Sequence, residues 1–267
     1  MRIEIDHTLT LSLQPGWNQL MLHLLLTPAA GPTQSVETWR VEAAGIDNAG
    51  QFVDAFGNRV HLVNQSRPEG EITIAARGIV VTADTNGVVG KPTGEPVPAL
   101  YKRVTALTKA PVTVWGKYRS GTETRLDILH GLMGRVGETL GLPEAAPVQM
   151  QATGEQKQSQ GPTSDEAALP DAAAYAHLFI GAARALDIPA RFVVGYLAAA
   201  EAGAGGLHAW AEAYDERLGW IGFDPRQQLC PTERYVRLAV GLDAETAVPL
   251  RTVPVGELAQ SVVAKGI

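Results

Sequence analysis

Two residues in the C-terminal half, His208 and Asp224, have the types and spacing for acid–base chemistry. They belong to "LHAWAEAYDERLGWIGFDP", residues 207 to 225, where polar or aromatic residues alternate with alanine before a tight turn. If that turn centres near Arg217, Trp210 lies opposite position 224, and Asp224 is one diagonal step from His208. A carboxylate held against an imidazole fixes its tautomer and supports its protonated form. The pair therefore predicts the orienting half of a nucleophile–base–acid triad.

The third member of such a triad is expected at the first turn of a helix. There the unsatisfied N–H groups and the helix dipole lower the pKa of a thiol, so a cysteine ionises to the thiolate. A helix of this kind is predicted to start near Asp171, in "DAAAYAHLFIGAARALDIPARFVVGY", residues 171 to 196. Its first turn contains no nucleophile, because Ala172, Ala173 and Ala174 stand there.

The N-terminal part of the chain has the pattern of β-strands. Apolar and polar side chains alternate through "IEIDHTLTLSL", residues 3 to 13, with the period of a half-buried strand. Further short strands are predicted in "VETWRVEA", "NRVHLV", "EITIAA" and "GIVVTAD". "DAFGNRV", residues 54 to 60, predicts a hairpin turn with Gly57 or Asn58 at positive φ. Antiparallel strands at this spacing indicate a β-sandwich.

The C-terminal part changes to helical spacing followed by strands. Apolar residues at helical intervals predict a helix over residues 125 to 140. The polar segment 151 to 166 has no periodicity and is predicted to be a surface loop, which could bind a partner or gate a cleft. "ARFVVGY", residues 190 to 196, predicts a strand that leads into the strands of residues 207 to 225.

Length and element order together predict an α+β protein of two domains. The chain has 267 residues, which is enough for two domains of ordinary size. We place an antiparallel β-sandwich in residues 1–100 and a core domain, with helices packed on an antiparallel sheet, in residues 101–267.

Composition excludes several classes of function. The formal net charge of −6 argues against a nucleic-acid partner, and there is no run of eighteen apolar residues to span a membrane. The single cysteine, Cys230, allows neither an internal disulfide nor a cysteine-based zinc site, and the six histidines lack ligand spacing. No metal or other cofactor is expected. The N-terminus is unlike a signal peptide, so a cytoplasmic location is expected.

The motifs "YAHLFIGAARALDIPARFVVGYL", "HAWAEAY" and "GWIGFDP", in this order, resemble the bacterial transglutaminase-like superfamily. "DAFGNRV" and the tail "LCPTERYVRLAVGLDAETAVPLRTV" resemble the preceding β-sandwich and the closing strands of the same bacterial subgroup. The resemblance implies a papain-like core related to cysteine proteases and transglutaminases. It also implies that the family's histidine falls on His208, its aspartate on Asp224 and its cysteine on Ala172. The family pattern Gly-x-Cys-Gln-Asp is replaced here by Pro170, Asp171, Ala172, Ala173 and Ala174.

A methyl group at residue 172 cannot attack a carbonyl, so the resemblance implies a site without its nucleophile. Removing the nucleophile of a comparable triad costs on the order of a million-fold in rate. The neighbouring glycine, glutamine and aspartate positions also depart from the pattern, which favours natural loss over an engineered cysteine-to-alanine change. We therefore expect a catalytically inactive transglutaminase-like protein that binds a peptide or protein partner, or regulates an active relative.

The alternative is an active thiol amidohydrolase of the cysteine protease or transglutaminase type. It requires Cys230 as a displaced nucleophile, or a parent chain with cysteine in place of Ala172. Cys230 has a plainer explanation as a small, inert residue that anchors its loop. A structural scaffold without any ligand is a third hypothesis, and the sequence does not determine the oligomeric state.

Other residues near the expected cleft also have structural explanations. His177, one helical turn beyond the three alanines, fits a buried structural histidine better than a substitute base. Trp210, Trp220 and Tyr214 are expected to pack the sheet, although aromatic walls could line a peptide cleft. Arg191 is expected to pair with a carboxylate and lock the helix against the strand.

Overall fold

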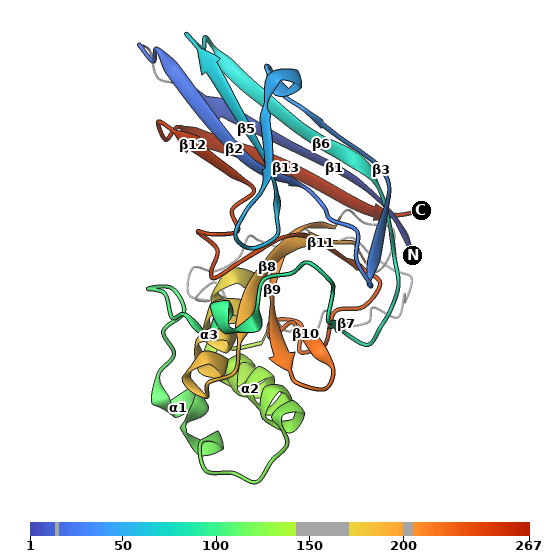
Figure 1. Cartoon of the computed structure of the whole chain (residues 1–267), viewed down its shortest axis with the longest axis vertical. Helices are drawn as coiled ribbons and strands as arrows, with labels where there is room; N and C mark the ends of the chain where they lie inside the picture. The colour runs from blue at the N-terminus through green and yellow to red at the C-terminus, as the bar shows by residue number, and fades with distance from the viewer. Residues whose placement is uncertain (14–15, 143–170, 200–204) are drawn as a thin grey trace, which may run out of the picture.

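The computed structural model describes residues 1–13, 16–142, 171–199 and 205–267. A β-sandwich lies at one end of the long axis, and a sheet carrying the helices lies at the other (Figure 1). This is the α+β architecture predicted from the order of elements. The predicted surface loop at 151–166 lies outside the described residues.

Eight strands form the β-sandwich: β1 Arg2–Ser12, β2 Gln19–Thr27, β3 Gln34–Glu42, β4 Gly50–Val53, β5 Arg59–Ser66, β6 Glu71–Thr82, β12 Leu250–Val253 and β13 Glu257–Gly266. They make two antiparallel sheets of four, in the orders β13–β1–β6–β3 and β12–β2–β5–β4. A short 3-10 helix, η1 (Ile46–Asn48), connects β3 to β4. The predicted hairpin turn at 54–60 joins β4 to β5, with Gly57 at a φ of 88°.

The strand pattern of the sequence is largely confirmed. In β1, Ile3, Ile5 and Leu9 are buried between the sheets, while the alternate residues face outward. One difference concerns β6, because the sequence predicted two strands where a single one of 12 residues runs through. Gly78 lies in its middle, where a Cβ would collide with the Thr38 backbone. The absent side chain thus permits close strand pairing and interrupts the apolar pattern.

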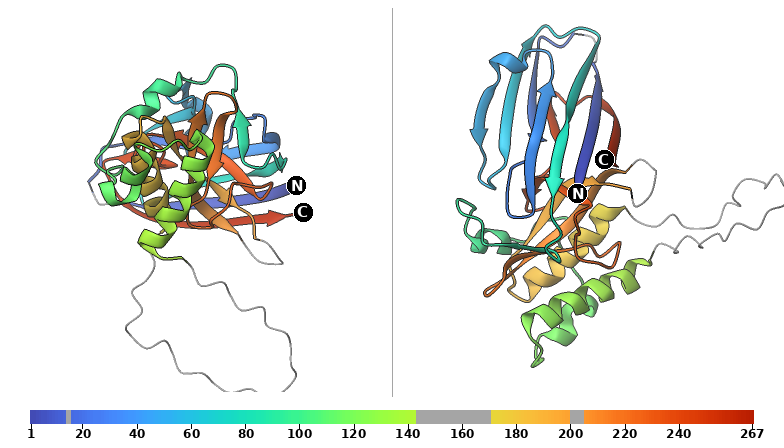
Figure 2. Two further views of the ribbon diagram at one scale, coloured as in Figure 1. Left: turned by 90° about the horizontal axis from the view of Figure 1, so that it is seen from below. Right: turned by 90° about the vertical axis from the view of Figure 1, so that its right-hand side faces the viewer.

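The sandwich is completed from the far end of the chain. β12 pairs with β2, and β13 pairs with β1 along ten residue positions. These two strands come after the core domain in sequence, within the range 101–267 that was assigned to the core. The domain boundary near residue 100 stays a prediction. Both chain termini lie close together beside the sandwich (Figure 2).

The core domain contains a five-stranded antiparallel sheet and its helices. Its strands are β7 Val88–Gly90, β8 Ala190–Leu197, β9 Gly206–Asp215, β10 Gly219–Phe223 and β11 Tyr235–Gly241, in the order β11–β8–β9–β10–β7. Its helices are η2 Pro98–Lys102, α1 Val112–Trp115, η3 Gly116–Tyr118, α2 Arg125–Leu140 and α3 Ala172–Ala185.

Helix α2 covers the residues predicted for it, and its start has a local cause. The Thr124 hydroxyl accepts from the Asp127 N–H, and the Asp127 carboxylate accepts in return from the Thr124 N–H. This reciprocal capping box satisfies two N–H groups that would otherwise lack partners.

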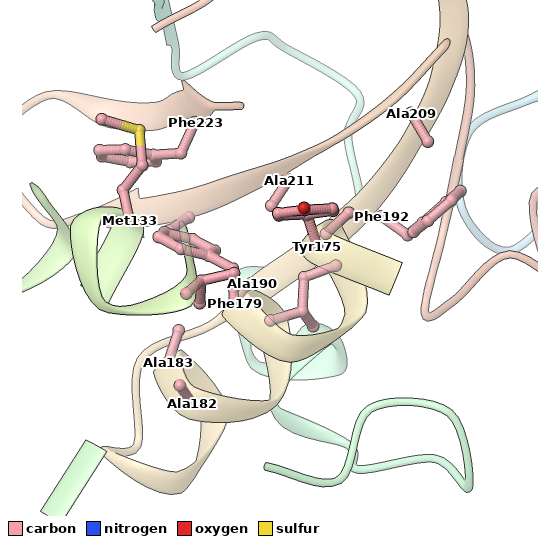
Figure 3. Close-up of a cluster of buried hydrophobic side chains, with 14 of the residues drawn as sticks. Met133, Tyr175, Phe179, Ala182, Ala183, Ala190, Phe192, Ala209, Ala211 and Phe223 are labelled. Atoms are coloured by element: carbon pink, nitrogen blue, oxygen red, sulfur yellow. The ribbon is translucent and has the colours of Figure 1, made fainter. Parts of the chain in front are cut away.

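Helix α3 packs on an alanine-rich face of the sheet (Figure 3). Ala209, Ala211 and Ala213 alternate along β9 and are buried against the helix. Phe179 of α3 stacks on Phe223 of β10 with ring centroids 5.2 Å apart. Small side chains on the strand allow the helix backbone to approach the sheet closely, and the aromatic pair fills the space beside it.

The buried ion pairs of Arg191 lie on the opposite face of the sheet. The Arg191 Nε donates to the Glu212 carboxylate and Nη1 donates to that of Glu95, each at 2.7 Å. The guanidinium lies 3.9 Å from the centroid of the Trp220 ring. The expected pairing of Arg191 with a carboxylate is confirmed, but the expectation that this pair locks the helix against the strand is wrong. Arg191 pairs with Glu212 across the β8–β9 ladder, on the face away from α3, and ties both strands to the segment before η2.

We predict that Arg191→Leu lowers the free energy of unfolding by about 3–5 kcal/mol, because the buried Glu212 and the partly buried Glu95 then keep only their longer ion pairs with Arg237. Urea unfolding followed by circular dichroism measures this. The matched control is Arg2→Leu, which breaks an exposed pair with Glu37 and should cost less than about 1 kcal/mol. Equal effects of the two substitutions would contradict a structural role for the buried pair.

Four histidines make the stability depend on pH. Burial lowers the pKa of His7, His23, His61 and His177 below the ordinary value of 6.5. The unfolded chain therefore takes up protons near pH 6.5 while the folded chain does not. The contribution of these neutral histidines to the free energy of unfolding is fully present above pH 6.5. It is lost as the pH falls below 6.5.

We predict lower urea midpoints at pH 5.5 than at pH 7.5 for this reason. His7 is fully buried, with Nδ1 3.0 Å from the Tyr196 hydroxyl, so His7→Gln should reduce the slope of stability against pH. An unchanged slope in this variant would remove His7 from the explanation.

Candidate functional site

The β9–β10 hairpin positions the two residues singled out in the sequence. Its register pairs Tyr214 with Trp220 and Ala211 with Phe223. Continued by one residue, this register puts Trp210 opposite Asp224, as predicted. The Asp215 carboxylate accepts from the Arg217 and Leu218 N–H groups and so shapes the turn that sets this register.

His208 and Asp224 form a short hydrogen bond at the end of this hairpin. The His208 Nε2 atom lies 2.6 Å from Asp224 Oδ2, and the side chains are 10% and 0% exposed. The imidazole thus reaches across the diagonal that the strand register provides. The catalytic roles of these residues remain predictions.

Asp224 is anchored by further donors besides the imidazole. Its Oδ1 accepts from the backbone N–H groups of Arg226 and Gln227, and its Oδ2 accepts from the Tyr235 hydroxyl at 2.8 Å. Burial, together with the Asp224 charge, raises the pKa of Tyr235, so the phenol stays a donor. Because these three donors fix the Asp224 carboxylate, the carboxylate in turn fixes the orientation of the imidazole.

Aromatic rings enclose His208. Trp210 lies nearly parallel to the imidazole with centroids 6.5 Å apart, and Tyr235 meets it edge-on at 5.9 Å. Sequence reasoning missed Tyr235, which begins β11. Its contact with Asp224 depends on how β11 pairs with β8, and no local signal in the sequence reveals that pairing.

Ala172 is the first residue of α3 and is 8% exposed within the apolar cluster that also holds Ala209. The four residues 186–189 connect α3 to β8, which returns along the helix. The start of α3 therefore lies at the end of the sheet where β9 begins. The strand β9 begins two residues before His208. By strand alternation His208 shares a face with Trp210, whereas Ala209 faces α3.

The start of α3 is capped by a carboxylate. Asp171 Oδ1 accepts from the Ala174 N–H at 3.0 Å, so one of the free N–H groups of the first turn is already satisfied. A negative charge at this position also opposes the formation of a second anion beside it.

His177 has a structural environment. Its Nε2 accepts from the Ala244 N–H at 3.0 Å, and its ring stacks on Phe192 with centroids 4.9 Å apart. Burial lowers its pKa and favours the neutral form that accepts this bond. These contacts agree with the structural explanation and give His177 no contact with His208.

Cys230 is partly buried beside Gly87, on the side of β10 that pairs with β7. Burial raises the pKa of its thiol above the ordinary value. A nucleophilic cysteine needs the opposite shift and a neighbouring base. None of the described residues' hydrogen bonds joins Cys230 to His208.

We predict that Cys230 reacts slowly with iodoacetamide, with an apparent pKa higher than that of a free cysteine. The alkylation rate between pH 7 and pH 10, followed by mass spectrometry, measures this. The same chain unfolded in urea is the control and should react faster. A fast reaction of the folded protein at pH 7 would revive the Cys230 route to catalysis.

We also predict that Asp224→Ala lowers the free energy of unfolding by about 2–4 kcal/mol. The substitution leaves two backbone N–H groups, an imidazole and a buried phenol without their acceptor. Tyr235→Phe is the matched control, since it removes a single one of these bonds and should cost about 1 kcal/mol. A loss below that of Tyr235→Phe would show that Asp224 does not organise this region.

Comparisons with known proteins identify the class of the chain. Residues 3–81 match the bacterial transglutaminase-like N-terminal region, and residues 152–225 match the transglutaminase-like superfamily core. The second range contains Ala172, His208 and Asp224. The chain therefore belongs to the transglutaminase-like superfamily, with the N-terminal region found in bacterial members.

Two individual proteins extend this result. An uncharacterized protein of Mycobacterium leprae is 24% identical over 246 residues, covering 85% of this chain and 83% of the relative. The crystal structure of a candidate cysteine protease from Cytophaga hutchinsonii matches with a TM-score of 0.69 and 17% identity, covering 99% of this chain and 90% of that one. This second likeness supports the fold across the whole chain. No helix within the described residues is long and apolar enough to cross a bilayer.

Proposed function

We propose that this transglutaminase-like, cysteine protease-like protein binds a peptide or protein at a site that has lost covalent catalysis. The observation that carries the proposal is the alanine at the first residue of α3. The start of α3 lies at the end of the sheet that bears His208, with the imidazole on the face away from the helix by strand alternation, and Ala172 supplies only a methyl group. Without a nucleophile, rate enhancement falls to the remnant that binding and electrostatics provide, roughly 10³–10⁴ over water.

The neighbourhood of Ala172 supports long-standing loss of function. Asp171 caps the helix with a carboxylate, and Ala173 and Ala174 offer no polar side chain to the first turn. A thiolate at residue 172 would meet this negative charge beside the N–H groups that the cap leaves free. The Asp171 cap thus stabilises the start of the helix and does not favour a thiolate.

The remaining groups can recognise an amide without cleaving it. Asp224 holds Nε2 of His208, and no hydrogen bond from the described residues occupies Nδ1. Nδ1 can therefore form a hydrogen bond with a peptide group of a ligand. Trp210 and Tyr235 are themselves buried and pack against the imidazole, so the ligand would contact the exposed part of the His208 ring.

The alternative of an active thiol enzyme has weaker support. Cys230, the only thiol, is partly buried with a raised pKa. An engineered replacement of cysteine by Ala172 would alter one position, while the departures from the family pattern extend to residues 170–174.

A single-thiol variant tests the placement of Ala172 against His208. We predict that the introduced thiol of Ala172→Cys, made in a Cys230→Ser background, has a lower apparent pKa than the same thiol after His208→Ala. The imidazolium favours a thiolate only if the two groups face each other. The alkylation rate against pH measures this shift. Equal thiol pKa values in the two variants would contradict the assignment of residue 172 to the site.

Turnover by the unaltered protein tests the loss of catalysis itself. We expect no hydrolysis of chromogenic peptide anilides and no incorporation of an amine into casein above a buffer control. Activity that disappears in Cys230→Ser would establish the enzyme alternative and overturn the proposal.

A further inference from the structure

β11 is an edge strand of the core sheet, and the sandwich lies against it (Figure 1). One side of its backbone pairs with β8, with a bulge between Arg237 and Ala239. Val236 and Leu238 are buried in the apolar cluster of the sandwich. The outer edge of a sheet carries backbone N–H and C=O groups that need partners. On β11 these partners are side chains of the sandwich.

Two buried carboxamide side chains stand in for a neighbouring strand. Gln34, which begins β3, donates from Nε2 to the Arg237 carbonyl and accepts at Oε1 from the Arg237 N–H, each at 2.8 Å. Asn58, in the β4–β5 hairpin, forms the same two bonds with Val240, at 2.7 and 2.8 Å. A carboxamide has the donor and the acceptor of a peptide group. Each of these side chains therefore takes the place of one residue of a strand partner.

Two of the sandwich contacts bracket Tyr235. The hydroxyl of Thr82, at the end of β6, donates to the Glu233 carbonyl, two residues before Tyr235. The contacts of Gln34 with Arg237 lie two residues after it. Both sandwich side chains belong to buried residues. The backbone on either side of Tyr235 is thus fixed by the sandwich.

Tyr235 carries this constraint into the candidate site. Its hydroxyl donates to Asp224 Oδ2 at 2.8 Å, and the same oxygen lies 2.6 Å from His208 Nε2. Hydrogen bonds that share an acceptor influence each other, and each weakens when its distance or angle leaves the preferred range. A displacement of β11 would therefore change the bond from Tyr235 to Asp224 and, through the shared oxygen, the bond from His208.

We propose that the sandwich positions the His208–Asp224 pair, with Gln34 and Thr82 as positioning residues that act through Tyr235. The two side chains hold the backbone around Tyr235, the phenol holds one oxygen of Asp224, and that oxygen receives the imidazole. This inference rests on the proposed function in taking the His208 ring as the group that a ligand contacts. It adds the part of the fold that keeps the ring in place.

The proton on His208 Nε2 gives a spectroscopic signature of the pair. In proton NMR of the full chain with ¹⁵N-labelled histidine, its resonance is assigned by its loss in His208→Gln. We expect Tyr235→Phe to shift this resonance, because Asp224 Oδ2 then loses its second donor. Gln34→Ala and the isosteric Thr82→Val should shift it in the same direction. In a Tyr235→Phe background the same two substitutions should cause no further shift.

Two variants separate positioning from stability. Thr82→Ser keeps the hydroxyl and should leave the resonance where it is. Asn58→Ala removes two bonds to β11 of the same kind as those of Gln34, but at Val240, five residues from Tyr235. It should lower the urea midpoint of unfolding as Gln34→Ala does, without shifting the resonance.

The accessibility of Tyr235 gives an independent readout. We expect nitration of Tyr235 by tetranitromethane, measured by mass spectrometry, to be faster in Gln34→Ala and Thr82→Val than in the unaltered protein. The fully buried Tyr175 of α3 is the internal control and should react equally slowly in all of them.

Three results would overturn the proposal. One is a resonance that does not respond to Thr82→Val and Gln34→Ala, and another is a shift that persists undiminished in the Tyr235→Phe background. The third is an equal shift in Asn58→Ala, because docking of the sandwich as a whole would then be responsible. These measurements use no ligand. Failure of the proposed binding function would leave the shifts in place, and failure of the positioning role would leave ligand binding by His208 unaffected.

Discussion

The packing of α3 on the alanine face of β9 is the constraint on which the core depends. Ala209, Ala211 and Ala213 leave room for a helix backbone, and Phe179 stacking on Phe223 sets how far along the sheet it lies. Because α3 is connected to β8 by a short turn, this packing also decides where the helix begins. The first turn of α3 is brought to the sheet end that carries His208. A larger side chain in this row would displace the helix and the site together.

The two faces of the same sheet are stabilised by different interactions. On the α3 face the residues are small and apolar, and cohesion comes from close contact. On the other face Arg191 lies between Glu212 and Glu95, against the Trp220 ring. Such a buried charge is stable only while each partner is present, so these residues act as one unit. This unit connects the segment leading into the core domain with its central strands.

Asp224 has a structural role that does not depend on catalysis. The carboxylate accepts from two backbone amides of the following loop, from the Tyr235 hydroxyl and from His208. These bonds stabilise the loop after β10 whether or not a nucleophile exists. Replacing Ala172, by comparison, affects one methyl group at a helix start. A substitution at residue 172 should therefore cost less stability than a substitution of Asp224.

The sequence alone determined those features that depend on neighbours along the chain. The period of β1, the bounds of α2 and the register of the β9–β10 hairpin follow from side-chain alternation, a capping box and a tight turn, which act within a few residues. The hydrogen bond of His208 to Asp224 followed from that register. Tertiary structure alone decided the contacts between distant segments: Tyr235 on Asp224, Glu95 on Arg191, and the return of β12 and β13 to the sandwich. Strand partners far apart in sequence are selected by the total burial of both sheets, and no single stretch of residues encodes that sum.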